Sequence, residues 1–193
     1  MKQLLFVYNP KAGRQRAKTM LSDVLTVFAQ EGYQITVRPT LGPGDATQVV
    51  ADTAAHYDRV VCCGGDGTLN ETVGGLLSLP QEERPVLGYI PAGTTNDFSR
   101  NINLPRSTQE LARVACGGVP RSIDVGDLGG RQFLYIAAFG LFTDVSYSTP
   151  QASKNLLGHL AYVLQGAGRL VNFPSYQVKV TTDQGLEVEG EFI

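Results

Sequence analysis

The chain has 193 residues, enough for one full domain and part of another, and 42% of them are hydrophobic, with 22 glycines and 10 prolines. This composition excludes a disordered or fibrous chain and fits a folded protein with many tight loops. The formal net charge of −2 excludes a nucleic-acid partner bound mainly through phosphate contacts, because no basic stripe is present.

The cysteines and the hydropathy of the sequence indicate the cellular compartment of the protein. The three cysteines have neither metal-ligand spacing nor an even count, which fits a reducing, cytoplasmic setting. The sequence shows no signal-peptide pattern and no stretch of about 18 apolar residues that could span a bilayer. We therefore expect a cytoplasmic protein.

The first predicted elements are a strand and a helix. Residues 4–8 form a short apolar run that ends at the turn residues 9–10, which predicts a buried parallel strand followed by a loop. Apolar residues then recur at spacings of three and four over residues 17–28, which predicts a helix with one apolar face that ends near Gly32. Strand, loop and helix in this order open a βαβ unit.

Three further strands are predicted, each followed by a helix. The strands cover residues 34–38, 59–63 and 86–90, and the helices cover residues 45–55, 69–77, a short segment from about 96, and 107–117. Residues 45–48 and 107–110 both have the spacing of a capping box. Four strands that alternate with helices predict an α/β fold, a doubly wound parallel sheet whose ligand site lies at the carboxyl ends of the strands.

Beyond about residue 120 the pattern changes to antiparallel strands. The predicted elements are strands at 123–128 and 133–139 with a turn at 129–130, a helix at 156–170, and strands at 176–182 and 186–193. The last strand reaches the final residue with no turn or cap after it, so we expect the chain to be cut inside its second domain. The sequence thus predicts an α/β domain over residues 1–120 and the first part of a β-rich domain over residues 121–193.

The strongest chemical signal is the run GGDGT at residues 64–68, between an apolar strand and a helix start. Consecutive glycines let the backbone approach a phosphate, and a helix N-terminus adds partial positive charge. A tight turn with Asp66 or Thr68 as a cap is the plainer alternative, but a cap needs one residue and not a run of five. We therefore predict a phosphate-binding site without a P-loop lysine.

Two other loops follow neighbouring strands. Residues 9–13 (NPKAG) follow the first strand, and taken alone they are as consistent with an ordinary loop as with a ligand site. Residues 91–98 (PAGTTNDF) follow the fourth strand and add hydroxyl, amide and carboxylate groups. Because the carboxyl ends of parallel strands share one edge of the sheet, the three loops together predict a single site there.

These three loops, with residues 145–150 (VSYSTP) and 158–162 (GHLAY), give the chain a resemblance to the diacylglycerol kinase catalytic-domain family, most closely its soluble bacterial lipid kinases. The glycine–aspartate loop alone is shared with NAD kinases and phosphofructokinases, whereas its combination with the other two loops is specific. The resemblance implies an NAD kinase/diacylglycerol kinase-like nucleotide-binding domain followed by a β-rich lipid- and metal-binding domain.

The activity implied is that of a lipid kinase that transfers the γ-phosphoryl of ATP to the hydroxyl of diacylglycerol or a related lipid, giving phosphatidic acid. Such an enzyme would meet its substrate by peripheral contact with the membrane. Phosphatidylglycerol, undecaprenol and sphingoid bases also offer a primary hydroxyl, so the lipid is left open. A homodimer is left open as well, because these residues do not define the oligomeric state.

The resemblance also implies ATP and Mg²⁺ as cofactors and assigns residues to both. Nucleotide contacts fall on Asn9, Pro10, Lys11, Ala12, Gly13, Thr40, Gly65, Asp66, Gly67, Thr68, Leu69, Asn70, Glu71 and Thr94. Asp66, Asp97 and Asp124 are placed in a catalytic acidic network that holds Mg²⁺ indirectly, through water. Taken singly, Asp97 could cap a helix, Asp124 could be a surface carboxylate and Glu71 a solvated helix residue.

The sequence departs from the family pattern because it ends early. The carboxylate taken as the family's general base is expected beyond residue 193. An NAD kinase-like small-molecule kinase is one alternative, although the loop at residues 94–97 favours a lipid kinase. A catalytically silent nucleotide-binding module is the other, since no residue here matches the base.

Overall fold

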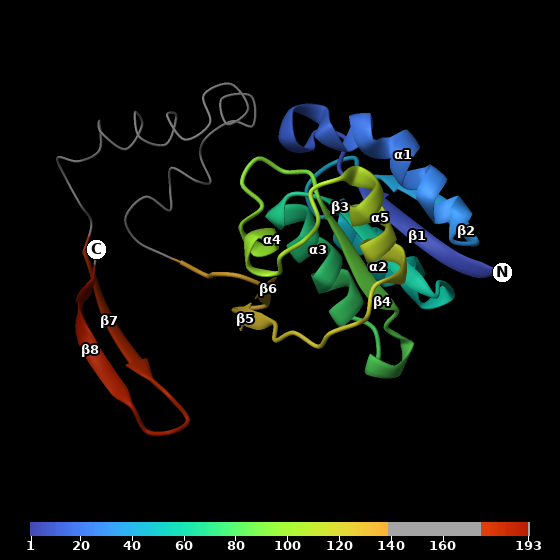
Figure 1. Ribbon diagram of the computed structural model, residues 1–193. Coiled ribbons are helices and arrows are strands. Elements are labelled where there is room, and N and C mark those ends of the chain that lie inside the picture. Colours follow the sequence, from blue (N-terminus) through green and yellow to red (C-terminus); the bar gives the residue numbers. More distant parts are fainter. Residues whose placement is uncertain (139–174, 193) are drawn as a thin grey trace. The chain divides into compact units, whose positions relative to one another are not determined.

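The structure, a computed structural model, describes residues 1–138 and 175–192 (Figure 1). Contacts divide the chain into two units, Met1–Ile136 and Ala137–Ile193. The domain boundary at residue 120 stays a prediction. No helix in the described part of the chain is long and apolar enough to cross a bilayer.

Four parallel strands form the sheet of the first unit, in the order β2–β1–β3–β4. Their bounds are Lys2–Tyr8 for β1, Tyr33–Pro39 for β2, Arg59–Gly64 for β3 and Val86–Pro91 for β4. The register sets Tyr8 beside Pro39 and Cys63, and Gly64 beside Pro91. The carboxyl ends of all four strands therefore share one edge, as the sequence predicts.

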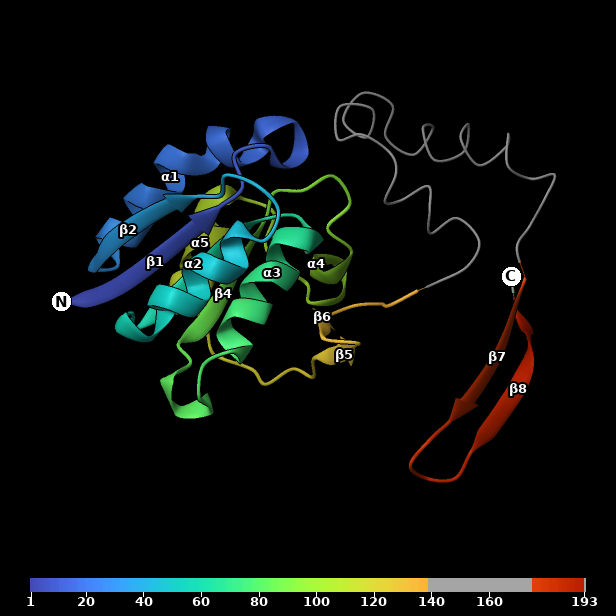
Figure 2. The same ribbon diagram turned by 180° about the vertical axis from the view of Figure 1, so that it is seen from behind.

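Helices cover both faces of this sheet. Their bounds are Arg16–Gln30 for α1, Asp45–Thr53 for α2, Asp66–Leu77 for α3, Asp97–Asn101 for α4 and Thr108–Gly117 for α5, with 3₁₀ turns η1 at Ala12–Gln15, η2 at Ala54–His56 and η3 at Gln81–Glu83. Helices α1 and α5 lie on one face, and α2 and α3 lie on the other (Figure 1, Figure 2). Because successive strand side chains point to opposite faces, Phe6 packs under α1 whereas Val7 packs under α2. The predicted doubly wound architecture is confirmed.

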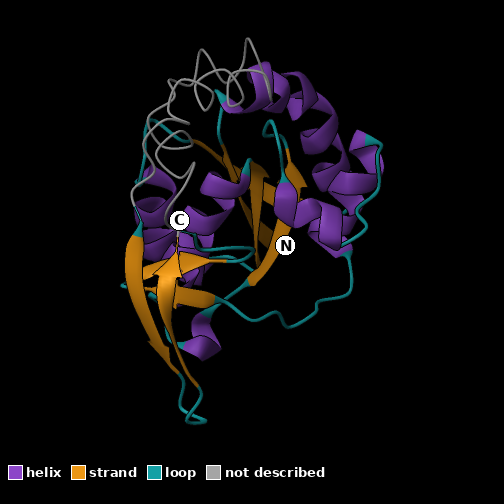
Figure 3. Cartoon of the chain, turned by 90° about the vertical axis from the view of Figure 1, so that its left-hand side faces the viewer, coloured by secondary structure: helices purple, strands orange, loops and turns teal. Residues whose placement is uncertain are grey.

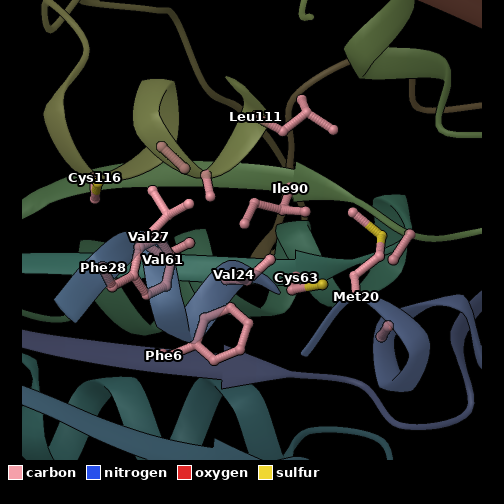
Figure 4. Close-up of a cluster of buried hydrophobic side chains, with 14 of the residues drawn as sticks. Phe6, Met20, Val24, Val27, Phe28, Val61, Cys63, Ile90, Leu111 and Cys116 are labelled. Atoms are coloured by element: carbon pink, nitrogen blue, oxygen red, sulfur yellow. The ribbon is translucent and has the colours of Figure 1, made fainter. Parts of the chain in front are cut away.

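The core under α1 follows the predicted helical spacing. Figure 4 shows Met20, Val24 and Phe28 of α1 directed toward the strand residues Phe6 and Ile90. The rings of Phe6 and Phe28 meet edge to face with centroids 5.5 Å apart. Burial of one such side chain stabilises the fold by about 1.5–3 kcal/mol, so this stripe fixes α1 to the sheet.

The two predicted capping boxes have different outcomes. Ser107 caps α5: its Oγ accepts the N–H of Glu110 at 3.3 Å and donates to the Glu110 carboxylate at 2.8 Å. Helix α2 is instead capped by Gly44 in the left-handed region, with φ of 82°. Asp45 lies inside the helix, and its carboxylate accepts the N–H of Leu41 at 2.9 Å. The box predicted at the start of α2 is therefore wrong, because its acidic side chain bonds to the preceding loop.

A short antiparallel hairpin follows α5. Its strands are β5, Gly126–Leu128, and β6, Arg131–Phe133. The turn residues Gly129 and Gly130 have φ of 59° and 83°, which glycine adopts at little cost and which suits the twist of a two-residue turn. The predicted turn is confirmed.

The strands of this hairpin are shorter than the sequence predicts. Residues 123–125 and 134–138 are not in strands, so the expected ranges 123–128 and 133–139 are wrong in length over the described residues. Val125 and Leu134, which flank the observed ladder, pack against an apolar cluster that includes residues of α3. Packing on the helix thus takes the place of further strand pairing.

The described residues of the second unit form one antiparallel hairpin (Figure 3). Its strands are β7, Tyr176–Thr181, and β8, Glu187–Phe192, close to the predicted bounds. Gly185 in the turn has φ of 81°. The predicted helix at 156–170 and the motifs at 145–150 and 158–162 lie outside the described residues.

The cysteines lead to a first prediction. Cys62 and Cys63 in β3 and Cys116 in α5 are all buried as free thiols. Burial raises the pKa of the Cys62 thiol to about 12 and also raises the pKa of Cys63 and Cys116. Because the thiolate is the reactive form, all three should resist iodoacetamide at pH 8 in the native chain and react in denaturant. Mass spectrometry counts the adducts, and fast native labelling of Cys62 would contradict this burial.

Candidate functional site

The three predicted loops meet at the carboxyl edge of the sheet. The N–H of Asn9, after β1, donates to the carbonyl of Cys63 at 2.9 Å. The N–H of Ala92, after β4, donates to the carbonyl of Gly64 at 2.8 Å. The loops after β1 and β4 therefore both bond to the end of β3, where the glycine-rich run begins.

Glycines allow these loops to pack backbone against backbone. Gly13 has φ of +47°, and a Cβ on it would collide with the carbonyl oxygen of Ala92. A Cβ on Gly93 would lie 2.5 Å from the Cα of Gly65. Only a residue without a side chain permits such approaches. The loop after β4 thus contacts both the loop after β1 and the glycine-rich run.

Most of the glycine-rich run at residues 64–68 belongs to the start of a helix and not to a loop. Helix α3 begins at Asp66, so only Gly65 separates it from β3, whereas the sequence places the helix start near residue 69. The first turn of α3 therefore contains Asp66, Gly67 and Thr68. N–H groups in a first turn have no partners within the helix, and the helix dipole favours an anion there. The predicted phosphate-binding chemistry corresponds to this N-terminus.

Asp66 bonds to the start of α4. Its Oδ2 accepts the N–H of Asp97 at 3.0 Å, and its Oδ1 accepts the N–H of Phe98 at 3.2 Å. The carboxylate of Asp97 lies 3.7 Å from the guanidinium of Arg100. Two of the three predicted acidic residues are thus neighbours. Each carboxylate oxygen has two lone pairs, so Asp66 can also accept a bond from water.

The third acidic residue is not joined to this pair. Asp124 is exposed in the segment before β5, and within residues 1–138 no hydrogen bond or ion pair connects it to Asp66 or Asp97. The described residues hold no group of three or more His, Cys, Asp or Glu side chains that could bind a metal directly. Asp66 and Asp97 fit an indirect role in which water lies between the carboxylates and Mg²⁺.

Asn9 and Thr68 connect the first loop to α3. The Asn9 amide donates to the Thr68 hydroxyl at 3.1 Å, and its oxygen accepts the N–H of Lys11 at 2.9 Å. Thr68 is only 8% exposed. The side chains of these two predicted nucleotide residues therefore hold the loops together in the described structure.

The remaining predicted nucleotide residues fall into two groups. Ala12 and Leu69 have side chains buried in the hydrophobic core, so a nucleotide at this edge would meet their backbones. The other residues are partly or fully exposed: Pro10, Lys11, Gly13, Thr40, Gly65, Gly67, Asn70, Glu71 and Thr94. The N–H of Thr40 donates to the carbonyl of Tyr8 at 2.9 Å, which places the end of β2 at the same edge.

Two residues that shape the site are not given a role of their own by the sequence analysis. The Tyr89 hydroxyl donates to the carbonyl of Gly64 at 3.2 Å, and burial, with the nearby charge of Asp66, raises the pKa of Tyr89. Asn96 bonds twice to Gly93, three residues earlier. The sequence analysis noted the amide of Asn96 in the loop at residues 91–98 but not its bonds to Gly93, and Tyr89 gives no signal because it lies inside an apolar strand.

An apolar groove of about 650 Å³ runs along β4. It is lined mostly by apolar side chains, among them Leu87, Tyr89, Phe98 and Val125. Of the predicted nucleotide residues, only Leu69 lines it. The groove is therefore distinct from the polar edge where the loops meet.

Comparison with known proteins identifies the family. Residues 3–128 match the family described as diacylglycerol kinase catalytic domain. The diacylglycerol kinase of Bacillus subtilis (strain 168) is 40% identical over 195 residues, which cover 100% of this chain and 63% of that protein. The diacylglycerol kinase of Staphylococcus aureus (strain MRSA252) is 36% identical over 192 residues, which cover 98% of this chain and 60% of that protein.

A solved structure agrees with these relatives. The crystal structure of a diacylglycerol kinase from Bacillus anthracis str. Sterne superimposes with a TM-score of 0.72 at 32% identity, over 98% of this chain and 61% of that chain. This chain thus spans about three fifths of the length of the relatives it matches. Since the matched residues 3–128 include all three loops, the chain belongs to the diacylglycerol kinase catalytic domain family.

Proposed function

We propose that this chain forms the nucleotide-binding part of an ATP-dependent lipid kinase that phosphorylates the hydroxyl of diacylglycerol or a related lipid. The observation that supports this most directly is the meeting of three loops around the N-terminus of α3 at one edge of a parallel sheet. Membership of the family supports phosphoryl transfer. The names of the relatives support diacylglycerol as the acceptor. Phosphorylation of its hydroxyl would give phosphatidic acid.

The first turn of α3 offers a binding site for the phosphates of ATP. Phosphoryl transfer depends mainly on positioning and on neutralising charge. Gly65 and Gly67 present backbone without side chains, and the helix N-terminus presents N–H donors and partial positive charge. Lys11, exposed in the loop after β1, adds a full positive charge to the same edge. These groups would orient the triphosphate.

The acidic pair would complete the site on its metal side. Mg²⁺ bound to the phosphates supplies further charge neutralisation. Asp66 and Asp97 would hold it through water, with Asp124 as a proposed third member. The general base is proposed to belong to the part of the relatives that this chain does not span. Because diacylglycerol resides in a bilayer, we also propose a cytoplasmic protein that contacts the membrane surface.

The test is transfer of labelled γ-phosphate from Mg·ATP to diacylglycerol in mixed micelles. The protein as the cell makes it and residues 1–193 alone would be assayed side by side, with Mg·ATP binding measured by calorimetry. We expect labelled phosphatidic acid from the cellular form, and Mg·ATP binding without turnover from residues 1–193. A panel of NAD, phosphatidylglycerol, undecaprenol and sphingosine would be run as alternative acceptors.

Each outcome separates the candidate functions. Labelled product from NAD and from no lipid would replace the lipid kinase with an NAD kinase-like enzyme. Mg·ATP binding with no product from any acceptor would indicate a silent nucleotide-binding module. Absence of Mg·ATP binding in both forms would contradict the nucleotide site itself.

A further inference from the structure

We propose that Asn96 is a positioning residue of the nucleotide site, which sets the turn through which the loop after β4 contacts the other two loops. The inference rests on the proposed nucleotide-binding function. Asn96 is 9% exposed, one of the few buried polar residues in the described part of the chain. It lies immediately before α4.

The amide of Asn96 closes the turn of residues 93–96. Its Oδ1 accepts the N–H of Gly93 at 2.7 Å, and its Nδ2 donates to the carbonyl of Gly93 at 2.8 Å. Its backbone has φ of 53° and ψ of 53°, a left-handed conformation that asparagine tolerates better than most residues. Both ends of the amide are thus bonded within the loop, which indicates a positioning role in place of direct contact with a ligand.

Gly93, which bonds to Asn96, is also the residue that contacts Gly65 of the glycine-rich run. A Cβ on Gly93 would lie 2.5 Å from the Cα of Gly65 and 2.7 Å from Oδ1 of Asn96. Gly93 therefore fits between these two residues with no space for a side chain. Gly65 is the N-cap of α3, so the position of Gly93 limits where the first turn of α3 can lie.

Asn96 also lies next to a second contact, the one between Asp66 and the start of α4. Its carbonyl accepts the hydroxyl of Ser99 at 2.8 Å and the N–H of Ser99 at 3.1 Å, which closes the first turn of α4. The N–H groups of that turn, from Asp97 and Phe98, bind Asp66. Asn96 thus lies between the Gly93–Gly65 contact and the α4–Asp66 contact. Its side chain holds the first contact, whereas the bonds to Ser99 come from its backbone carbonyl and remain after a substitution.

The test compares Asn96→Gly with a matched control, Asn103→Gly. Glycine keeps a positive φ at low cost and removes both side-chain bonds. Asn103 is exposed in the turn after α4 and has φ of 47°. It is therefore also an asparagine with a left-handed backbone, but it takes no part in the contacts described above. Mg·ATP affinity would be measured by calorimetry, and amide exchange at residues 93–98 by mass spectrometry.

We expect Asn96→Gly to weaken Mg·ATP binding about tenfold, because the loop without its two side-chain hydrogen bonds adopts the binding conformation less often, and to speed amide exchange at residues 93–98. Asn103→Gly should change neither. Asn96→Asp keeps an acceptor for the N–H of Gly93 but sets a carboxylate oxygen against the carbonyl of Gly93 and adds negative charge at a site proposed to bind an anion, so its affinity should fall at least as far as that of Asn96→Gly. Unfolding temperatures of all three variants report general destabilisation separately.

The outcomes distinguish the two proposals. Equal Mg·ATP affinity in the unaltered chain and in Asn96→Gly would overturn the role of Asn96. If the unaltered chain binds no Mg·ATP, the proposed function fails, and exchange then decides the positioning role. Faster exchange in Asn96→Gly alone would support that role, and unchanged exchange would refute it.

Discussion

In the protein as the cell makes it, replacement of Asp66 by alanine is expected to lower lipid-kinase turnover by about 10²–10³-fold, the range found when one source of transition-state charge stabilisation is lost, here the Mg²⁺ that Asp66 is proposed to hold. This side chain has one task that is proposed and one that the structure shows. It supplies negative charge beside the proposed metal site, and it accepts the N–H groups of Asp97 and Phe98 at 3.0 and 3.2 Å. The measurement is the initial rate at saturating ATP and lipid, and near-normal turnover would contradict both tasks.

Asp66→Asn separates the two tasks. The amide oxygen can still accept from one N–H group of α4, whereas the charge is gone. A fall in turnover as large as that of Asp66→Ala, with unchanged amide exchange at residues 97 and 98, would assign the effect to the charge, because the amide group also replaces one of the two acceptors by a donor. Turnover close to normal in Asp66→Asn alone would assign it to the support of α4. Thermal unfolding of both variants serves as the control, because loss of global stability would lower both rates without discriminating.

Gly13→Ala is expected to lower the free energy of unfolding by about 2–5 kcal/mol, from a left-handed backbone conformation combined with overpacking. Gly13 has φ of +47°, and its new Cβ would meet the carbonyl oxygen of Ala92. The first loop would have to leave the loop after β4, so Mg·ATP affinity should fall as well. Urea unfolding and calorimetry measure the two effects.

Gly32→Ala is the matched control for this prediction. Gly32 has φ of +82°, but nothing lies within 4 Å of a Cβ built on it. Its replacement therefore reports the cost of the backbone conformation alone, about 1–2 kcal/mol, with no change in Mg·ATP affinity. If Gly13→Ala costs no more than Gly32→Ala, the close contact between the two loops is not important for stability.

The sequence by itself determined which elements form, their order and the chemistry at their ends. Apolar runs such as residues 59–63 predict buried strands, and the spacing of apolar residues over 17–28 predicts α1, because both signals depend on neighbours in the chain. The three loops are recognised for the same reason. Their convergence at one sheet edge follows from the rule that parallel strands place their carboxyl ends together.

Only the tertiary structure decided which side chains bond to one another. The two capping boxes have the same spacing, yet Ser107 caps its helix while Asp45 bonds to Leu41. Leu69, predicted to contact the nucleotide, is buried because α3 starts three residues earlier than expected and turns that side chain into the core. Such choices depend on competing partners, which a local pattern does not contain.

The residues of the candidate site likewise meet through contacts between distant parts of the chain, which a local pattern does not contain. Asp66 and Asp97 are 31 positions apart and meet only because β3 and β4 are adjacent in the sheet. The role proposed for Asn96 depends on the contact between Gly93 and Gly65, which exists only in the folded chain. Local sequence determines the groups that are present at the sheet edge, and the packing of distant segments determines whether each group holds the loops together or faces a ligand.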